Sequence, residues 1–350
     1  MKKMILMVVA AIVAVTATYA QGSLLATLSH EGNISVFYGS NALKSAVTAA
    51  ANGDVITLSS GQFNAVDITK NITLRGAGIN VSTDSLNLNE PTMILGSFSI
   101  NVAETVSGRL AMEGLYFSSS IIYSGTLKNA QFLKCRFRSL YNNGSAVMTN
   151  TSFIHCRFYD GFKMDKNSSS QFINCIVCRP TSRESNSTIE FDNCFIKFDG
   201  FSNQSYGDAA WANRVQNAYY KNCIIQCCQN ISYNTIYGSC INCIGLGGYS
   251  QMFSYMTNST NKFVSSISSL FKTYNVTNTD TYINDSWSFE LTEEAIQTYL
   301  GTDGTQVGIY GGNLPYDENS TIPQITKCNV ASKSTADGKL SVDITVNGAE

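Results

Sequence analysis

A cysteine with an apolar residue three positions before it recurs through the middle of the chain at nearly constant spacing. The segments read FLKCRF, FIHCRF, FINCIV, FDNCFI, YKNCII and CINCIG, and their cysteines are Cys135, Cys156, Cys175, Cys194, Cys223 and Cys243. Successive cysteines are 21, 19, 19, 29 and 20 residues apart. A unit this short cannot bury its own apolar side chains and must stack on its neighbours, so the repeat predicts a solenoid.

The order of residues within each repeat predicts the shape of one coil. One apolar residue lies three positions before the cysteine and another lies two positions after it. The second interval fits a strand with both side chains on one face, whereas the first breaks the alternation and requires a bend. The residue just before the cysteine, or before Ile72 and Leu115 in two upstream repeats, is Asn or Gly in six of eight cases, and these residues tolerate positive φ. The eight bend positions are Asn71, Gly114, Lys134, His155, Asn174, Asn193, Asn222 and Asn242.

These patterns predict an all-β chain that forms a right-handed, single-stranded parallel β-helix. Stacked coils place equivalent residues about 4.8 Å apart, so the bend asparagines are expected to hydrogen-bond along a ladder. The repeat cysteines are expected to point inward as small apolar residues with free thiols. Disulfides between some of the 11 cysteines stay possible. Zinc is not expected at CINC or CIVC, because the repeat already explains both and the two pairs lie too far apart in the sequence.

The first residues have the composition of a secretory signal peptide, residues 1–20. Lys2 and Lys3 precede an apolar run that ends at small residues, Thr18 and Ala20. We therefore expect export to the periplasm, the cell surface or the outside of the cell. No later segment is long enough to span a membrane. With 14% charged residues and a net charge of −2, a nucleic-acid partner is not expected.

The rest of the chain divides into four predicted parts. Residues 21–38 are a lead, and 39–312 form the β-helix, which begins with a capping helix. That helix is expected to start at Ser40 or Asn41, to bury Leu43, Val47 and Ala50, and to end near Gly53. Residues 313–323 are a linker, and 324–350 form a β-hairpin or part of a truncated sandwich.

The segment ALKSAVTAAANGDVITLSSGQFNAVDITKNITLRGAG resembles the start of proteins in the pectin-lyase-like superfamily of secreted bacterial β-helices. GTDGTQVGIYGG resembles their closing coil. The resemblance implies a polysaccharide lyase, hydrolase or esterase, or a member that only binds polysaccharide. Lyases of this kind use an Arg or Lys base beside acidic residues that hold calcium. The polygalacturonase-like pattern is incomplete, since one Asn-Thr-Asp (Asn278 to Asp280) lacks the paired Asp and the Gly-His-Gly.

The residue directly after the cysteine position points outward and changes character along the chain. In the first half it reads Thr73, Tyr116, Arg136 and Arg157, and we call the last three the polar stripe. Aromatic rings and guanidinium groups suit an acidic sugar chain, although the interpretation of the two arginines as ordinary solvated charges on an exterior strand is favoured. His155 is expected to be a structural bend residue. Asp160 and Asp165, in nearby loops, are weak calcium candidates.

In the second half the same outward position is apolar, and we call this set the apolar strip: Ile176, Phe195, Ile224 and Ile244. Such a strip is usually covered. The insertion before Cys223, the residues after Gly248 or another subunit are the candidate covers.

The sequence therefore predicts an exported β-helix protein that binds a polysaccharide, or less favourably cleaves one. A non-catalytic structural or adhesive surface protein is the first alternative. A lyase acting on a uronate-containing glycan is the second, in which an Arg would take the proton next to the carboxylate. No catalytic residue is assigned, and the possible cofactor is calcium.

Overall fold

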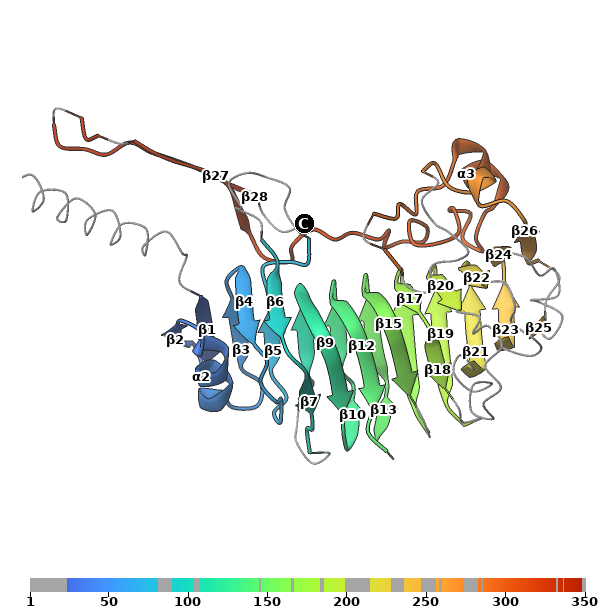
Figure 1. Cartoon of the computed structure of the whole chain (residues 1–350), viewed down its shortest axis with the longest axis horizontal. Helices are drawn as coiled ribbons and strands as arrows, with labels where there is room; N and C mark the ends of the chain where they lie inside the picture. Colours follow the sequence, from blue (N-terminus) through green and yellow to red (C-terminus); the bar gives the residue numbers. More distant parts are fainter. Residues whose placement is uncertain are drawn as a thin grey trace, which may run out of the picture.

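The computed structural model shows a parallel β-solenoid of about 8 turns, as the repeat predicted. It describes residues 24–80, 90–103, 108–144, 146–164, 167–182, 186–198, 215–227, 236–246, 256–257, 260–273, 283–284, 286–331, 333–335 and 337–347. The predicted signal peptide, Asp165 and the Asn-Thr-Asp segment lie outside these residues. Figure 1 shows the coils stacked along the long axis of the molecule, with the C-terminal segment running back along one edge.

The N-terminal end is closed by a hairpin and a helix. β1 (Leu25–His30) pairs antiparallel with β2 (Asn33–Tyr38) and with β3 (Val55–Leu58), the first strand of the coils. α2 (Ala42–Ala49) buries Leu43 and Val47, as its apolar spacing predicted, and Ala50 beyond its end is buried too. The hairpin was not expected, because β2 is an edge strand whose apolar side chains face outward and give no burial pattern.

One sheet of the solenoid carries the polar stripe and the apolar strip, and we call it the stripe sheet. Its strands pair in parallel, each with the next. They are β4 (Gly61–Asn64), β6 (Thr92–Leu95), β9 (Leu115–Tyr123), β12 (Arg136–Asn142), β15 (Arg157–Met164), β17 (Ile176–Cys178), β20 (Phe195–Phe198), β22 (Ile224–Cys227), β24 (Ile244–Leu246) and β26 (Lys262–Val264).

The second sheet is built in the same way from the strands that precede each bend. After β3 they are β5 (Thr73–Arg75), β8 (Ala111–Glu113), β11 (Gln131–Leu133), β14 (Thr151–Ile154), β16 (Ser169–Ile173), β19 (Thr188–Asp192), β21 (Val215–Lys221), β23 (Ile236–Ile241) and β25 (Met256–Thr257). Short strands complete several coils: β7 (Phe98–Ile100), β10 (Thr126–Lys128), β13 (Val147–Thr149) and β18 (Pro180–Ser182).

The interior is filled by columns of equivalent side chains. In one column the rings of Phe132, Phe153 and Phe172 are stacked, with centroids 4.9 and 4.6 Å apart. The six repeat cysteines form another column, in which every thiol is buried and free. The Cys156 N–H, for example, donates to Cys175 Sγ at 3.3 Å. The predicted inward position of the cysteines is confirmed.

The bends between the two sheets follow the sequence pattern with one exception. Seven of the predicted bend residues have φ between 48° and 61°, and they are Gly114, Lys134, His155, Asn174, Asn193, Asn222 and Asn242. Asn71 does not belong to this set. The residue after Ile72, Thr73, pairs with Ala111 in the second sheet, and Met93 rather than Thr73 precedes Tyr116 in the stripe sheet. The alignment of that first repeat was therefore wrong.

The chain leaves the coils earlier than residue 312. Among the described residues, β26 is the last strand that pairs in parallel with a coil. A turn of 3-10 helix, η3 (Ile267–Ser269), and α3 (Glu293–Thr298) follow. Residues 300–320, which we call the strap, then return along the bends, and β27 (Gln324–Val330) and β28 (Val342–Asn347) form an antiparallel hairpin that projects from the body (Figure 1). The supposed closing coil, GTDGTQVGIYGG, is thus part of the strap.

Candidate functional site

The apolar strip lies beneath the C-terminal part of the same chain. Its four side chains are 2% exposed or less. They form a second apolar cluster outside the coils with Phe271, Trp287, Phe289 and other residues up to Tyr316. The prediction that residues after Gly248 cover the strip is confirmed. Whether the protein forms an oligomer stays untested, but a single chain already buries these four side chains, so they offer no surface to another subunit.

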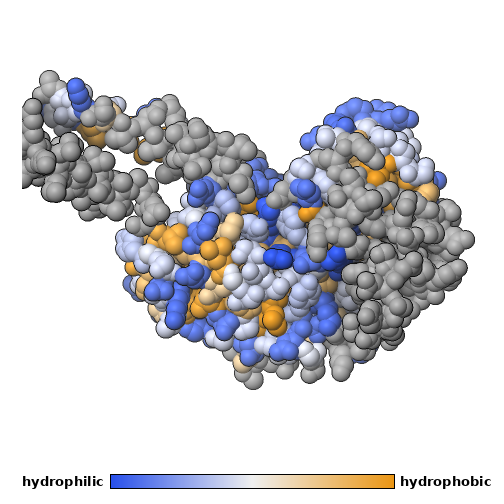
Figure 2. Space-filling model, viewed as in Figure 1, coloured by the Kyte–Doolittle hydropathy of each residue, from blue (hydrophilic) through white to orange (hydrophobic). Residues whose placement is uncertain are grey.

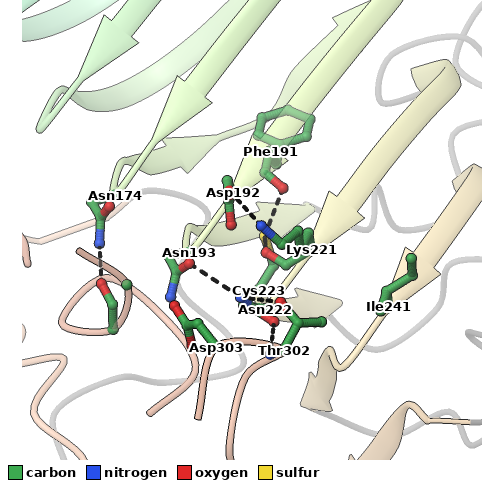
Figure 3. Close-up of polar contacts among 12 residues, drawn as sticks. Asn174, Phe191, Asp192, Asn193, Lys221, Asn222, Cys223, Ile241, Thr302 and Asp303 are labelled. Carbon is green, nitrogen blue, oxygen red and sulfur yellow. Dashed lines mark hydrogen bonds and ion pairs between the residues drawn. The ribbon is translucent and has the colours of Figure 1, made fainter. Parts of the chain in front are cut away.

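The strap is held by the side chains of the bends. Asn174 Nδ2 donates to the carbonyl oxygens of Ile309 and Gly311, both at 2.8 Å. Asn222 Oδ1 accepts from the Thr302 N–H at 2.9 Å. Figure 3 shows Asn174, Asn193 and Asn222 directed at this segment. Asn222 Nδ2 and Asn193 Oδ1 do lie 3.4 Å apart, but the shorter bonds go to the strap, so the expected Asn ladder is mainly a row of anchors.

Further along, two bend residues of other types hold the strap's last part. His155 Nε2 lies 3.0 Å from the Leu314 carbonyl oxygen, which fits its predicted structural role. Lys134 Nζ bonds to Asp317 Oδ2 at 2.6 Å. Burial acts to raise the pKa of Asp317, but the bonds from Lys134 and the Asn319 N–H, together with the charge of Lys134, outweigh it and hold that pKa below its ordinary value.

The polar stripe forms a continuous column of rings and guanidinium groups. Arg136 lies in register with Tyr116 on one neighbouring coil and with Arg157 on the other. Its Cζ is 4.2 Å from the ring centre of Tyr116 and 4.5 Å from that of Tyr159. Arg157 Cζ lies 4.9 Å from the Tyr159 ring. We call Tyr116, Arg136, Tyr159 and Arg157 the Tyr–Arg column.

The two arginines of the polar stripe differ in their surroundings. Arg136 and both tyrosines are half-buried on the outer face. Arg157 is buried, with 6% exposure, and its Nη2 donates to the Asn284 carbonyl oxygen at 2.7 Å. Glu318 Oε1 lies 3.7 Å from Arg157 Nη1. The reading of Arg157 as a solvated surface charge is therefore wrong, because the strap and the segment at Asn284 cover it.

Asp160 takes part in a charge cluster beside the Tyr–Arg column. Its carboxylate lies 3.2 Å from Arg179 Nη1 and 3.8 Å from Arg138 Nε. Two guanidinium groups already neutralise this carboxylate, which disfavours calcium there. Within the residues that the structure describes, no group of three or more His, Cys, Asp or Glu side chains is placed to hold a metal ion. Calcium at Asp165 stays a prediction.

The sequence reasoning missed Tyr159 and Arg138. Both lie two positions after a stripe arginine, so strict alternation along β12 and β15 would have placed them on the outer face.

In Figure 2 the upper edge of the molecule is hollowed between the projecting hairpin and the lobe around α3. Hydrophilic surface predominates around that hollow (Figure 2).

Comparison of the chain with family models, with curated proteins and with solved structures gives no match. The parallel β-helix is established by the strand pairing described above. Membership in the pectin-lyase-like superfamily stays a prediction. Among the described residues, no helix has the length and apolar character needed to cross a membrane.

Proposed function

We propose that this is an exported β-helix protein that binds an acidic polysaccharide along the Tyr–Arg column. The observation that carries the proposal is the position of the Arg136 guanidinium, which lies against the Tyr116 and Tyr159 rings at 4.2 and 4.5 Å on an outer face. Two rings hold the group in one place, so less side-chain freedom is lost when a ligand binds.

The chemistry of this face suits a uronate-containing chain. A guanidinium group recognises a carboxylate through two parallel N–H bonds, and tyrosine rings offer flat apolar surfaces with a polar edge to sugar rings. Arg138, whose side chain is 62% exposed, adds a cation beside the column. Because the column runs along the solenoid axis, an extended polymer can contact several coils at once.

Substitution of Arg136 tests the proposal. Arg136→Ala should weaken binding of oligogalacturonates about ten-fold or more, because a hydrogen bond to a charged group contributes about 1.5–3 kcal/mol. Isothermal titration calorimetry at low ionic strength measures the change. Arg109→Ala is the matched control, since Arg109 is exposed and precedes β8 rather than lying in the column.

Equal affinities of the wild type and Arg136→Ala would rule out this site. Binding should also weaken as salt is raised, since the attraction between exposed charges is largely screened beyond about 10 Å at 0.1 M salt. The same mixtures, assayed for unsaturated uronate products, test the lyase alternative.

A second candidate function is that of a rigid surface spacer with a docking tail. The observation that favours it is the apolar face of β28, where Val342, Ile344 and Val346 are 51%, 51% and 54% exposed. A two-stranded hairpin is marginally stable alone. If the hairpin attaches the protein to the cell surface, deletion of residues 324–350 should release it into the medium without changing glycan binding.

A further inference from the structure

We propose that the end of the strap is a built-in competitor for the acidic ligand, with the Glu318 carboxylate occupying the place at Arg157 that a ligand carboxylate would take. The inference rests on the proposed function and concerns how that same site is regulated. It divides the Tyr–Arg column into a half-buried part, at Tyr116 and Arg136, and a buried part, at Arg157.

The two parts belong to one binding surface. Arg157 is the register partner of Arg136 on the next coil, so the two side chains leave adjacent strands at equivalent positions. Both guanidinium groups contact the same ring, that of Tyr159, at 4.5 and 4.9 Å. A polymer that follows the column from Tyr116 would therefore meet Arg157 next.

The atoms that now face Arg157 are of the kind that an acidic sugar would present. The Asn284 carbonyl oxygen lies 2.7 Å from Nη2, and Glu318 Oε1 lies 3.7 Å from Nη1. The Tyr316 hydroxyl donates to the same Glu318 oxygen at 2.6 Å, which orients the carboxylate. At 3.7 Å the Arg157–Glu318 contact is longer than a direct hydrogen bond, so a ligand carboxylate that approaches more closely can replace it.

The strap is held differently along its length. From 300 to 312 it is bonded to buried amides such as Asn174 and Asn222, which are 2% and 0% exposed. Its end is bonded through the Glu318 carbonyl oxygen to Asn80 Nδ2 and carries two ion pairs, in which the carboxylates of Asp317 and Glu318 are 38% and 28% exposed while their cationic partners are 10% and 8% exposed. Partly exposed ion pairs contribute little to stability. The Glu318 side chain is therefore the part of the strap that can move away from Arg157 while the main chain stays bound.

This arrangement makes affinity depend on ligand length. A short ligand that contacts only Tyr116 and Arg136 leaves Glu318 in place. A longer ligand that also reaches Arg157 must displace the Glu318 carboxylate, and part of its binding free energy is spent on that displacement.

The test compares Glu318→Gln with the wild type, using oligogalacturonates of increasing length as probes in calorimetry. Loss of the competing charge should tighten the binding of long probes about two- to five-fold, the range expected for one partly exposed ion pair. Short probes should bind both proteins equally. Glu190→Gln is the matched control, because Glu190 is exposed on β19 in the second sheet. Equal melting temperatures would show that Glu318→Gln leaves the fold intact.

Each of the other outcomes decides for or against the inference. If Arg136→Ala weakens binding but Glu318→Gln changes nothing, the site is real and the competitor is not. If Glu318→Gln and Glu190→Gln tighten binding alike, the effect is one of overall charge and the inference fails. If no probe binds the wild type but long probes bind Glu318→Gln, the strap closes the site fully. If neither protein binds any probe, both the proposed function and the inference fall.

Discussion

Equivalent residues on adjacent coils have different roles once the strap is in place. Arg136 and Arg157 pair in register, yet one is half-buried on the outer face and the other is buried beneath the strap. The repeat placed both side chains on the outside correctly. It could not show that Arg157 is covered, because Asn284 lies 127 residues away and carries no recognisable pattern.

The buried position of Arg157 gives a prediction about stability. Arg157→Ala should lower the free energy of unfolding by about 1.5–3 kcal/mol, since a charged hydrogen bond to the Asn284 carbonyl is lost at a buried position. Urea unfolding followed by fluorescence measures this. Arg136→Ala, whose side chain is more exposed, should change stability far less, and equal losses for both variants would contradict the structure.

A second residue-scale prediction concerns the ion pair of His30 and Asp54, whose Nδ1 and Oδ1 are 2.8 Å apart. The hydrogen bond to Asp54 raises the pKa of His30 above its ordinary 6.5. Burial acts to raise the pKa of Asp54, but the bonds from the Ala51 N–H and His30 outweigh it, so that pKa lies below its ordinary 3.8.

These two shifts set the pH range in which the pair stabilises the fold. The His30 contribution is fully present below 6.5 and is lost as the pH rises through the raised pKa. The Asp54 contribution is present above 3.8 and is lost as the pH falls through the lowered pKa. Melting temperatures of the wild type and His30→Gln should therefore differ most near pH 5 and converge towards pH 8. A constant difference across that range would exclude the pair as its cause.

At the scale of elements, the bends are the parts that join the coils to the strap. Their backbone has positive φ, which Asn and Gly adopt most readily and which Lys134 and His155 also adopt here. Their side chains form hydrogen bonds that hold the strap, as Asn174 does with Ile309. Asn meets both needs, because its amide can donate and accept hydrogen bonds.

Two substitutions at one bend separate these contributions. Asn174→Gly keeps the positive φ and removes the bonds to Ile309 and Gly311, and it should cost about 1–3 kcal/mol. Asn174→Ala should cost about 1–2 kcal/mol more, because alanine is strained in the left-handed region. Thermal unfolding of both variants measures the difference. Asn129→Gly, at an exposed bend with φ of 55°, is the control and should have little effect, because it removes only a solvent-exposed bond from Asn150 Nδ2.

The coils could be predicted from the sequence because their contacts repeat every 20 residues or so. The order of Phe132, Cys135 and Phe137 predicts one coil, and the same order of residues predicts the next. The strap could not be predicted, since Asn174 and Ile309 are 135 residues apart and their bond involves a main-chain oxygen. The site was half predictable: outward alternation places Tyr116 and Arg136, but burial of Arg157 depends on the strap.

For the whole molecule, the column of cysteines predicts how the protein responds to thiol reagents. The repeat cysteines are buried and free, and burial raises the pKa of the Cys194 and Cys223 thiols, so the reactive thiolate is scarce. Native protein should react slowly with a thiol reagent. After unfolding without reductant, at least the eight thiols that the structure shows as free should react. A large fast-reacting fraction in the native state would contradict the buried column.

The course of the strap means that the coils of this solenoid are not stabilised by their nearest neighbours alone. A simple repeat protein resembles a one-dimensional chain of units, each stabilised by its neighbours, which can unravel from either end. Here Asn80 in an early coil bonds to the Glu318 carbonyl, 238 residues later, and thereby ties the two ends of the array together. Native contacts of such long sequence separation slow folding and couple distant coils. The early coils therefore gain these contacts only after the strap, which follows all the coils in the sequence, has been synthesised.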